Sequence, residues 1–89
     1  MKLNKLQLDL FKYLTSDKQI KTLEERKALV IKRREAVEEL EQVLVSDDLK
    51  EFAVIEWNRL HKEELELELK IINLKKFQTE FMLDRMNAE

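Results

Sequence analysis

The chain has 89 residues, a formal net charge of −2 and no glycine, proline or cysteine. Disulfide and thiol chemistry are therefore excluded, a β fold lacks the residues that its tight turns need, and the small net charge does not by itself require a nucleic-acid or membrane partner. Hydrophobic residues make up 44% of the chain and charged residues 40%, a combination typical of long helices and coiled coils. We expect one all-α domain over residues 1–89.

The first predicted helix covers about residues 2–14. Apolar residues recur there at spacings of three and four, which places them on one helical face: Leu3, Leu6, Leu10, Tyr13 and Leu14. Ser16 and Gln19 fit a capping box, so a break is expected near residues 15–17. Because no glycine is available to end the first helix, a kink is the alternative to a full reversal.

The second predicted helix covers about residues 17–45. Its apolar residues recur every seven positions, at Leu23, Val30, Val37 and Leu44. In a coiled coil, the positions four residues after these also face the partner helix. Here they are occupied by the charged residues Lys27, Arg34 and Glu41. A strict two-stranded coiled coil prefers apolar residues there, so a looser helical bundle is expected.

The third predicted helix covers about residues 47–86. Ser46, Asp47 and Asp48 form a good helix start, since carboxylates complement the positive end of the helix dipole. A seven-residue repeat follows, formed by Ala53, Leu60, Leu67, Leu74 and Phe81. Such a helix is roughly 60 Å long. With a reversal near residue 46, the second and third helices form a long antiparallel hairpin.

The expected hairpin pairs residues whose numbers sum to about 92. Leu23 then lies near Leu69, Val30 near Lys62, and Val37 near Ile55. The third helix overhangs the second from about residue 76 to residue 86, and the first helix is long enough to cover that overhang. In this arrangement Leu10, Phe11 and Leu14 meet Phe77, Phe81 and Met82.

A second apolar stripe runs along the third helix beside the first, and includes Leu65, Leu69 and Ile72. A helix with two apolar stripes requires cover from two sides. We therefore predict self-association into a helical bundle, with a dimer favoured. The residues predicted to form the partner or oligomer interface are Trp57, Leu65, Leu69, Ile72, Phe77, Phe81, Met82 and Met86.

Candidate catalytic and metal-binding residues are few. His61 has Glu64 and Glu68 at helical spacing, but one histidine without cysteine is a weak metal site, and a surface or boundary histidine is the preferred interpretation. Ser16 and Ser46 are the only serines and both are interpreted as helix caps. We expect no enzyme activity, no cofactor and no metal.

The leading functional hypothesis is a small cytoplasmic adaptor, inhibitor or antagonist that binds a larger protein through the apolar stripes of the third helix. Charges interrupt every apolar run, so neither a signal peptide nor a membrane span is expected. One alternative is a structural or assembly protein, a scaffold or chaperone, whose function is the oligomer itself. Another is a transcriptional regulator that binds nucleic acid through the basic stretch 18–34, although the glutamates expected opposite it argue against this function.

Overall fold

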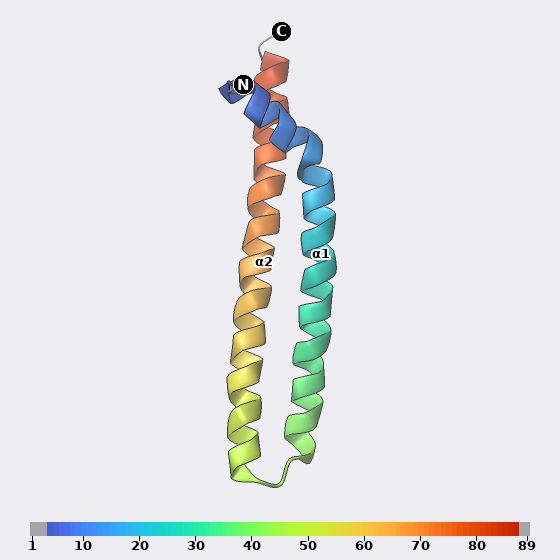
Figure 1. The fold of residues 1–89 in the computed structure, drawn as a ribbon, viewed down its shortest axis with the longest axis vertical. Helices are drawn as coiled ribbons and strands as arrows, with labels where there is room; N and C mark the ends of the chain where they lie inside the picture. The colour runs from blue at the N-terminus through green and yellow to red at the C-terminus, as the bar shows by residue number, and fades with distance from the viewer. Residues whose placement is uncertain (1–3, 88–89) are drawn as a thin grey trace.

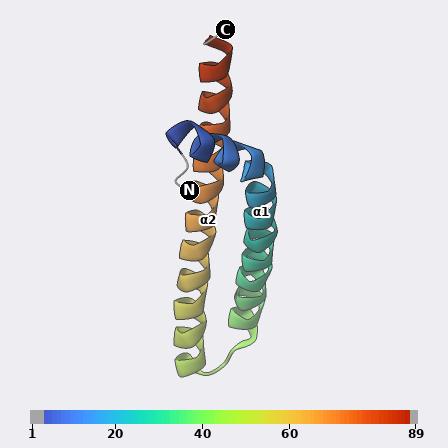
Figure 2. The same ribbon diagram turned by 45° about the horizontal axis from the view of Figure 1, so that its top comes forward.

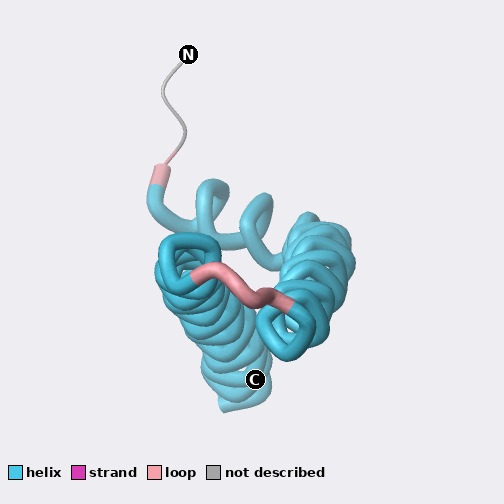
Figure 3. The backbone as a smooth tube through the Cα atoms, turned by 90° about the horizontal axis from the view of Figure 1, so that it is seen from below, coloured by secondary structure: helices cyan, strands magenta, loops and turns pink. Residues whose placement is uncertain are grey.

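The computed structural model describes residues 4–87, which form two long helices (Figure 1). Helix α1 spans Lys5–Val43 and helix α2 spans Asp47–Asn87. The two run antiparallel and side by side over most of their length, and residues 44–46 connect them at one end (Figure 3). The molecule measures 65 × 28 × 15 Å. The predicted all-α hairpin is confirmed, whereas the predicted division into three helices is wrong.

The starts of the two helices follow from their first residues. At the start of α1, the backbone N–H of Gln7 donates to Oδ1 of Asn4 at 2.8 Å, and Gln7 Oε1 accepts from the Asn4 backbone at 3.0 Å. These reciprocal bonds are a capping box that satisfies two otherwise unpaired donors. In α2, Asp47 and Asp48 occupy the first turn, as predicted. The predicted beginning of the first helix, with Leu3, lies outside the described residues.

The break predicted near residues 15–17 is a bend within α1. The first turns of α1 turn away from the rest of the helix and cross α2 near its C-terminal end (Figures 1 and 2). In this part of α1, Thr15 Oγ1 donates to the Phe11 carbonyl at 3.0 Å, and Ser16 Oγ donates to the Tyr13 carbonyl at 2.6 Å. Hydroxyl bonds of this kind compete with the helical ladder and favour bending.

Because the helix continues through the bend, the predicted capping box at Ser16 does not form. The side chain of Gln19 donates to the hydroxyl of Thr15 at 3.0 Å instead. Ser16 is fully buried. Its hydroxyl accepts a 2.7 Å bond from Nε2 of Gln78, so it ties the bend to α2. The kink, which the sequence left open as the alternative, is what the structure contains.

The core is a single seam between the two helices. Val30 of α1 packs with Leu60 and Leu67 of α2, and these three side chains are 2%, 1% and 4% exposed. Leu23 and Val37, each two turns away from Val30 along α1, pack against this cluster. The seven-residue repeats of both predicted helices therefore face each other across the seam, which is the arrangement expected of an antiparallel coiled coil.

The register of the hairpin differs from the prediction. Tyr13 stacks on Phe81, and Glu38 bonds to Trp57, so paired residue numbers sum to 94 or 95 rather than 92. The predicted contact of Leu23 with Leu69 is wrong, because Leu69 is 58% exposed. Val30 likewise packs against two leucines rather than Lys62, and Ile55 is exposed rather than under Val37. Side-chain interlocking sets the register, and counting outward from the turn does not reproduce it.

Candidate partner-binding surfaces

The two apolar stripes of α2 have different environments. The first stripe faces α1 and contains the buried residues Ala53, Leu60, Leu67 and Ile71. The second stripe contains Leu65, Leu69 and Ile72, which are 52%, 58% and 53% exposed. No other part of the chain within residues 4–87 covers it. One hairpin therefore buries only one of the two stripes.

The exposed stripe continues toward both ends of α2. We call it the α2 strip, and it consists of Val54, Leu65, Leu69, Ile72 and Leu83. All five side chains are between 45% and 58% exposed. At mid-length it borders a groove of about 370 Å³ between the helices, to which α1 contributes Ala28 and Ile31. The apolar surface at the middle of the rod thus includes both helices.

A second apolar surface lies where the first turns of α1 cross α2. The rings of Tyr13 and Phe81 stack with centroids 4.7 Å apart, and Lys12 Nζ lies 4.2 Å from the centroid of the Phe77 ring. A groove of about 390 Å³ opens beside this crossing. We call its lining the open-end surface: Leu10, Tyr13, Leu14, Phe81, Met82, Arg85 and Met86.

The structure separates the C-terminal residues that the sequence grouped together. Phe77 and Phe81 are half-buried under α1, whereas Met82 and Met86 are 43% and 66% exposed. Phe11, which was expected to cover them, is 64% exposed, and Tyr13 takes that place. Tyr13 was recognised as part of the apolar face, but the bend that turns it onto Phe81 has no signal in helical periodicity.

Trp57 lies in the seam rather than on a free surface. Its Nε1 donates to Oε1 of Glu38 at 2.7 Å, and its ring stacks on His61 at a centroid distance of 4.8 Å. The same Glu38 oxygen accepts from Arg34 at 2.9 Å, and Arg34 also bonds to Glu64 at 3.0 Å. We call Arg34, Glu38, Trp57, His61 and Glu64 the polar layer. Because these side chains bond to one another, the charged residue Arg34 can occupy a position of the repeat that faces the other helix.

The basic stretch 18–34 does not form one continuous basic face. Arg34 is 20% exposed and is paired with carboxylates inside the polar layer. Arg26 donates to Glu63 of α2 at 2.8 Å, and Lys75 of α2 lies 3.5 Å from Glu24. The pairs of Arg26 and Arg34 with glutamates of α2 were expected from the sequence, whereas the pair in which α2 supplies the lysine was not. The glutamates paired with Arg26 and Arg34 neutralise part of the surface that a nucleic acid would need.

Glu56 and Arg59 form an exposed ion pair one turn apart on α2. The hydrogen bond from the Arg59 guanidinium lowers the pKa of the Glu56 carboxyl, and the positive charges of Arg59 and Arg33 lower it further. The same hydrogen bond raises the pKa of Arg59. Because both side chains are in contact with water, the pair contributes little to folding.

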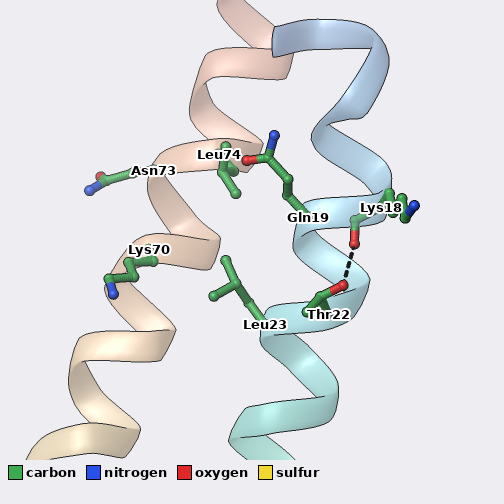
Figure 4. A pocket seen from close by; sticks show the side chains of 7 residues that line it. All are labelled: Lys18, Gln19, Thr22, Leu23, Lys70, Asn73 and Leu74. Carbon is green, nitrogen blue, oxygen red and sulfur yellow. Dashed lines mark hydrogen bonds between the residues drawn. The ribbon is translucent and has the colours of Figure 1, made fainter.

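A larger groove of about 580 Å³ lies just below the bend, between the two helices (Figure 4). Leu23 and Leu74 point into the space between the helices, while the end of Lys18 points away from it. Thr22 donates to the Lys18 carbonyl at 3.0 Å and stays within its own helix. The groove is shallow and mainly apolar.

Chemistry-bearing side chains are sparse in the described part of the chain. Between residues 4 and 87, no group of three histidine, cysteine or carboxylate side chains is arranged to hold a metal ion. His61 Nδ1 lies 3.7 Å from Glu64 and neither donates nor accepts a hydrogen bond. Over the same residues, neither helix is sufficiently long and apolar to cross a membrane. No protein-family model, curated protein or solved structure matches this chain.

Proposed function

We propose that the protein is a small helical adaptor or inhibitor that binds a larger protein through the open-end surface. The observation that carries this proposal is the exposure of large flexible side chains beside a preformed aromatic stack. Leu14, Met82 and Met86 are 69%, 43% and 66% exposed around the groove beside the Tyr13–Phe81 stack. Methionine and aromatic residues are enriched at the centres of protein interfaces, where they supply most of the binding energy.

The shape of this surface favours an amphipathic helix of the larger protein as the bound segment. A groove of about 390 Å³ accommodates a few large apolar side chains, which a helix presents at spacings of three and four. The stacked rings hold one wall of the groove in place, so its side chains lose little conformational entropy when a partner binds. Flexible methionines on the other wall adapt to the shape of the bound side chains. Such a complex would block or bridge its target.

The proposal is tested by photo-crosslinking from the open-end surface. A photoreactive residue in place of Met86 is expected to crosslink to one protein in an extract of the native host. The matched position is Leu40 of α1, which is 57% exposed and lies outside both apolar surfaces, and a photoreactive residue there is expected not to crosslink to that protein. Leu14→Glu should abolish the crosslink from position 86. Equal crosslinking from positions 40 and 86 would contradict the proposal.

A structural or assembly role is the second candidate, and the exposed α2 strip is the observation that favours it. Leu65, Leu69 and Ile72 of the strip lie along the middle of α2, and only Leu83 lies beside the open-end surface, so an oligomer centred on the strip leaves most of that surface free for a partner. The two roles are therefore compatible in one protein. They are distinguished by variants that change one surface at a time.

A further inference from the structure

We infer that the α2 strip binds a second copy of this chain, with the two rods antiparallel, to form a four-helix bundle. The hairpin tip of each copy then lies beside the open end of the other. This inference uses none of the open-end residues, so it does not depend on the proposed function. Three independent properties of the chain support it: its exposed area, the spacing of the strip, and the distribution of its charges.

The first property is the excess of accessible surface. A compact monomer of 10.8 kDa exposes about 5,500 Å². This chain exposes 7461 Å², so the difference is about 1,900 Å². A standard stable interface buries about 800 Å² on each partner. One dimer contact along the rod therefore fits within the excess area and removes a little under half of it.

The second property is the symmetric spacing of the strip. Val54, Leu65, Ile72 and Leu83 follow one another at intervals of eleven, seven and eleven residues. These intervals are close to whole numbers of helical turns, so the four side chains share one face. They are also almost equally exposed, at 45%, 52%, 53% and 52%.

A spacing that reads the same in both directions is what a two-fold antiparallel contact requires. With the axis between residues 68 and 69, Leu65 of one copy faces Ile72 of the other, and Val54 faces Leu83. On α1, Ala28 and Ile31 border the same groove as Glu68 and Ile72, so they add apolar surface beside the strip. Both helices of each hairpin thus take part in the bundle.

The third property is the polarity of charge along the rod. Residue 26 of α1 lies opposite residue 68 of α2 in the observed register. The half next to the hairpin tip, residues 26–68, contains twelve acidic and eight basic residues. The half next to the open end, residues 4–25 and 69–87, contains eight basic and six acidic residues. Two rods packed in the same direction place like charges together. Antiparallel packing places each acidic half beside a basic half, at a separation within the range of unscreened interaction.

The oligomeric state and two single variants test the inference. Sedimentation equilibrium at micromolar concentration is expected to give twice the chain mass of 10.8 kDa. Leu65→Glu and Ile72→Lys should each raise the dissociation constant at least about a hundredfold, because each change enters the dimer twice. Leu40→Glu, at an equally exposed position outside the strip, should leave the dissociation constant unchanged. A monomeric wild-type chain, or a dimeric Leu65→Glu variant, would overturn the inference.

A mixing experiment tests the antiparallel geometry itself. When the Leu65→Glu and Ile72→Lys chains are mixed, the heterodimer has one Glu–Lys contact and one Leu–Ile contact, so dimers should reappear. Any arrangement in which residue 65 faces residue 65 gives no rescue, and failure to rescue would refute the antiparallel dimer. Far-UV circular dichroism is expected to show unchanged helicity in all variants, because the substituted side chains are more than half exposed in the hairpin. If crosslinking from position 86 were lost while the dimer stayed intact, the proposed function would be contradicted and the inferred dimer would not.

Discussion

At the scale of single residues, the polar layer is the least expected feature of this hairpin. Arg34 and Glu64 occupy the seam between two helices, where their side chains are only 20% and 16% exposed. Each charged group there is compensated by another, and Trp57 donates to the same carboxylate as Arg34. Layers of this kind add specificity of register more readily than stability, since removing the charges from water offsets most of the attraction.

The polar layer predicts a strong asymmetry between single and double substitutions. Arg34→Met should destabilise the hairpin by about 1–3 kcal/mol, because Glu64 then loses the guanidinium that neutralises it. The double variant Arg34→Leu with Glu64→Leu should be about as stable as the wild type, since a leucine pair fills the seam without buried charge. Urea denaturation of the three proteins measures both differences. A double variant less stable than Arg34→Met would show that the pair itself stabilises the fold.

The exposed pair of Glu56 and Arg59 predicts a pH dependence confined to acidic conditions. The hydrogen bond from Arg59 lowers the pKa of Glu56 below its ordinary value of 4.5. A group with a lowered pKa in the folded state contributes its stabilisation above the unfolded pKa, and the contribution is lost as the pH falls through the folded value. This pair should therefore have no effect on the pH dependence of folding at neutral pH.

Arg59→Gln should raise the pKa of Glu56 toward 4.5, and an NMR titration of the Glu56 side-chain carboxyl carbon measures it. Arg33→Gln is the matched control. It should raise the pKa by less, because Arg33 acts on Glu56 by charge alone. An equal rise in both variants would show that the hydrogen bond is not the main cause.

At the scale of the elements, the hairpin depends on one interlocked seam rather than on helix propensity. Helices of this length remain marginal in water unless an apolar face is covered. The seam of α1 and α2 covers one face of each helix around Val30, Leu60 and Leu67. The bend in α1 adds a second contact at the open end, where Ser16 and Gln78 are joined across the helices.

The seam predicts a large difference between two leucine substitutions. Leu60→Ala should cost about 2–5 kcal/mol, because the side chain is 1% exposed and leaves a cavity beside Val30. Leu40→Ala removes the same atoms from a position that is 57% exposed and should change stability by less than about 0.5 kcal/mol. Thermal denaturation followed by circular dichroism compares the two. If both substitutions lowered the free energy of unfolding by similar amounts, Leu60 would not be part of the seam.

At the scale of the whole molecule, a rod of 65 × 28 × 15 Å leaves much of its surface in water. The chain forms only two layers of helix, so it buries fewer of its apolar side chains than a compact domain of the same mass does. In the inferred dimer, the open-end surfaces lie at opposite ends of the bundle. A dimeric adaptor of this shape would bind two copies of its target about one rod length apart.

The charge polarity of the rod predicts that added salt weakens the dimer. Raising the salt concentration from about 0.05 M to about 0.5 M shortens the Debye length to a few ångströms and screens the attraction between acidic and basic halves. The dissociation constant should therefore rise, whereas a dimer held by apolar contacts alone should tighten slightly or stay constant. Sedimentation equilibrium at the two salt concentrations distinguishes these outcomes, with helicity as the control for folding.

Much of the fold follows from local patterns in the sequence. The seven-residue repeats predict two long antiparallel helices, and the carboxylates at Asp47 and Asp48 predict where α2 begins. The apolar residues of the second stripe are also evident from spacing alone. Whether Leu65 and Ile72 bind a partner stays a prediction, because spacing shows only that they share an apolar face.

The remaining features depend on contacts between residues far apart in the chain. Whether Thr15 and Ser16 end a helix or bend it depends on α2, where Gln78 is placed to bond the Ser16 hydroxyl. The register likewise depends on how Val30 fits between two leucines. Periodicity shows which face of a helix is apolar, because that is a property of one helix. Only the tertiary structure decides which side chains meet, because the free energy of packing depends on both helices at once.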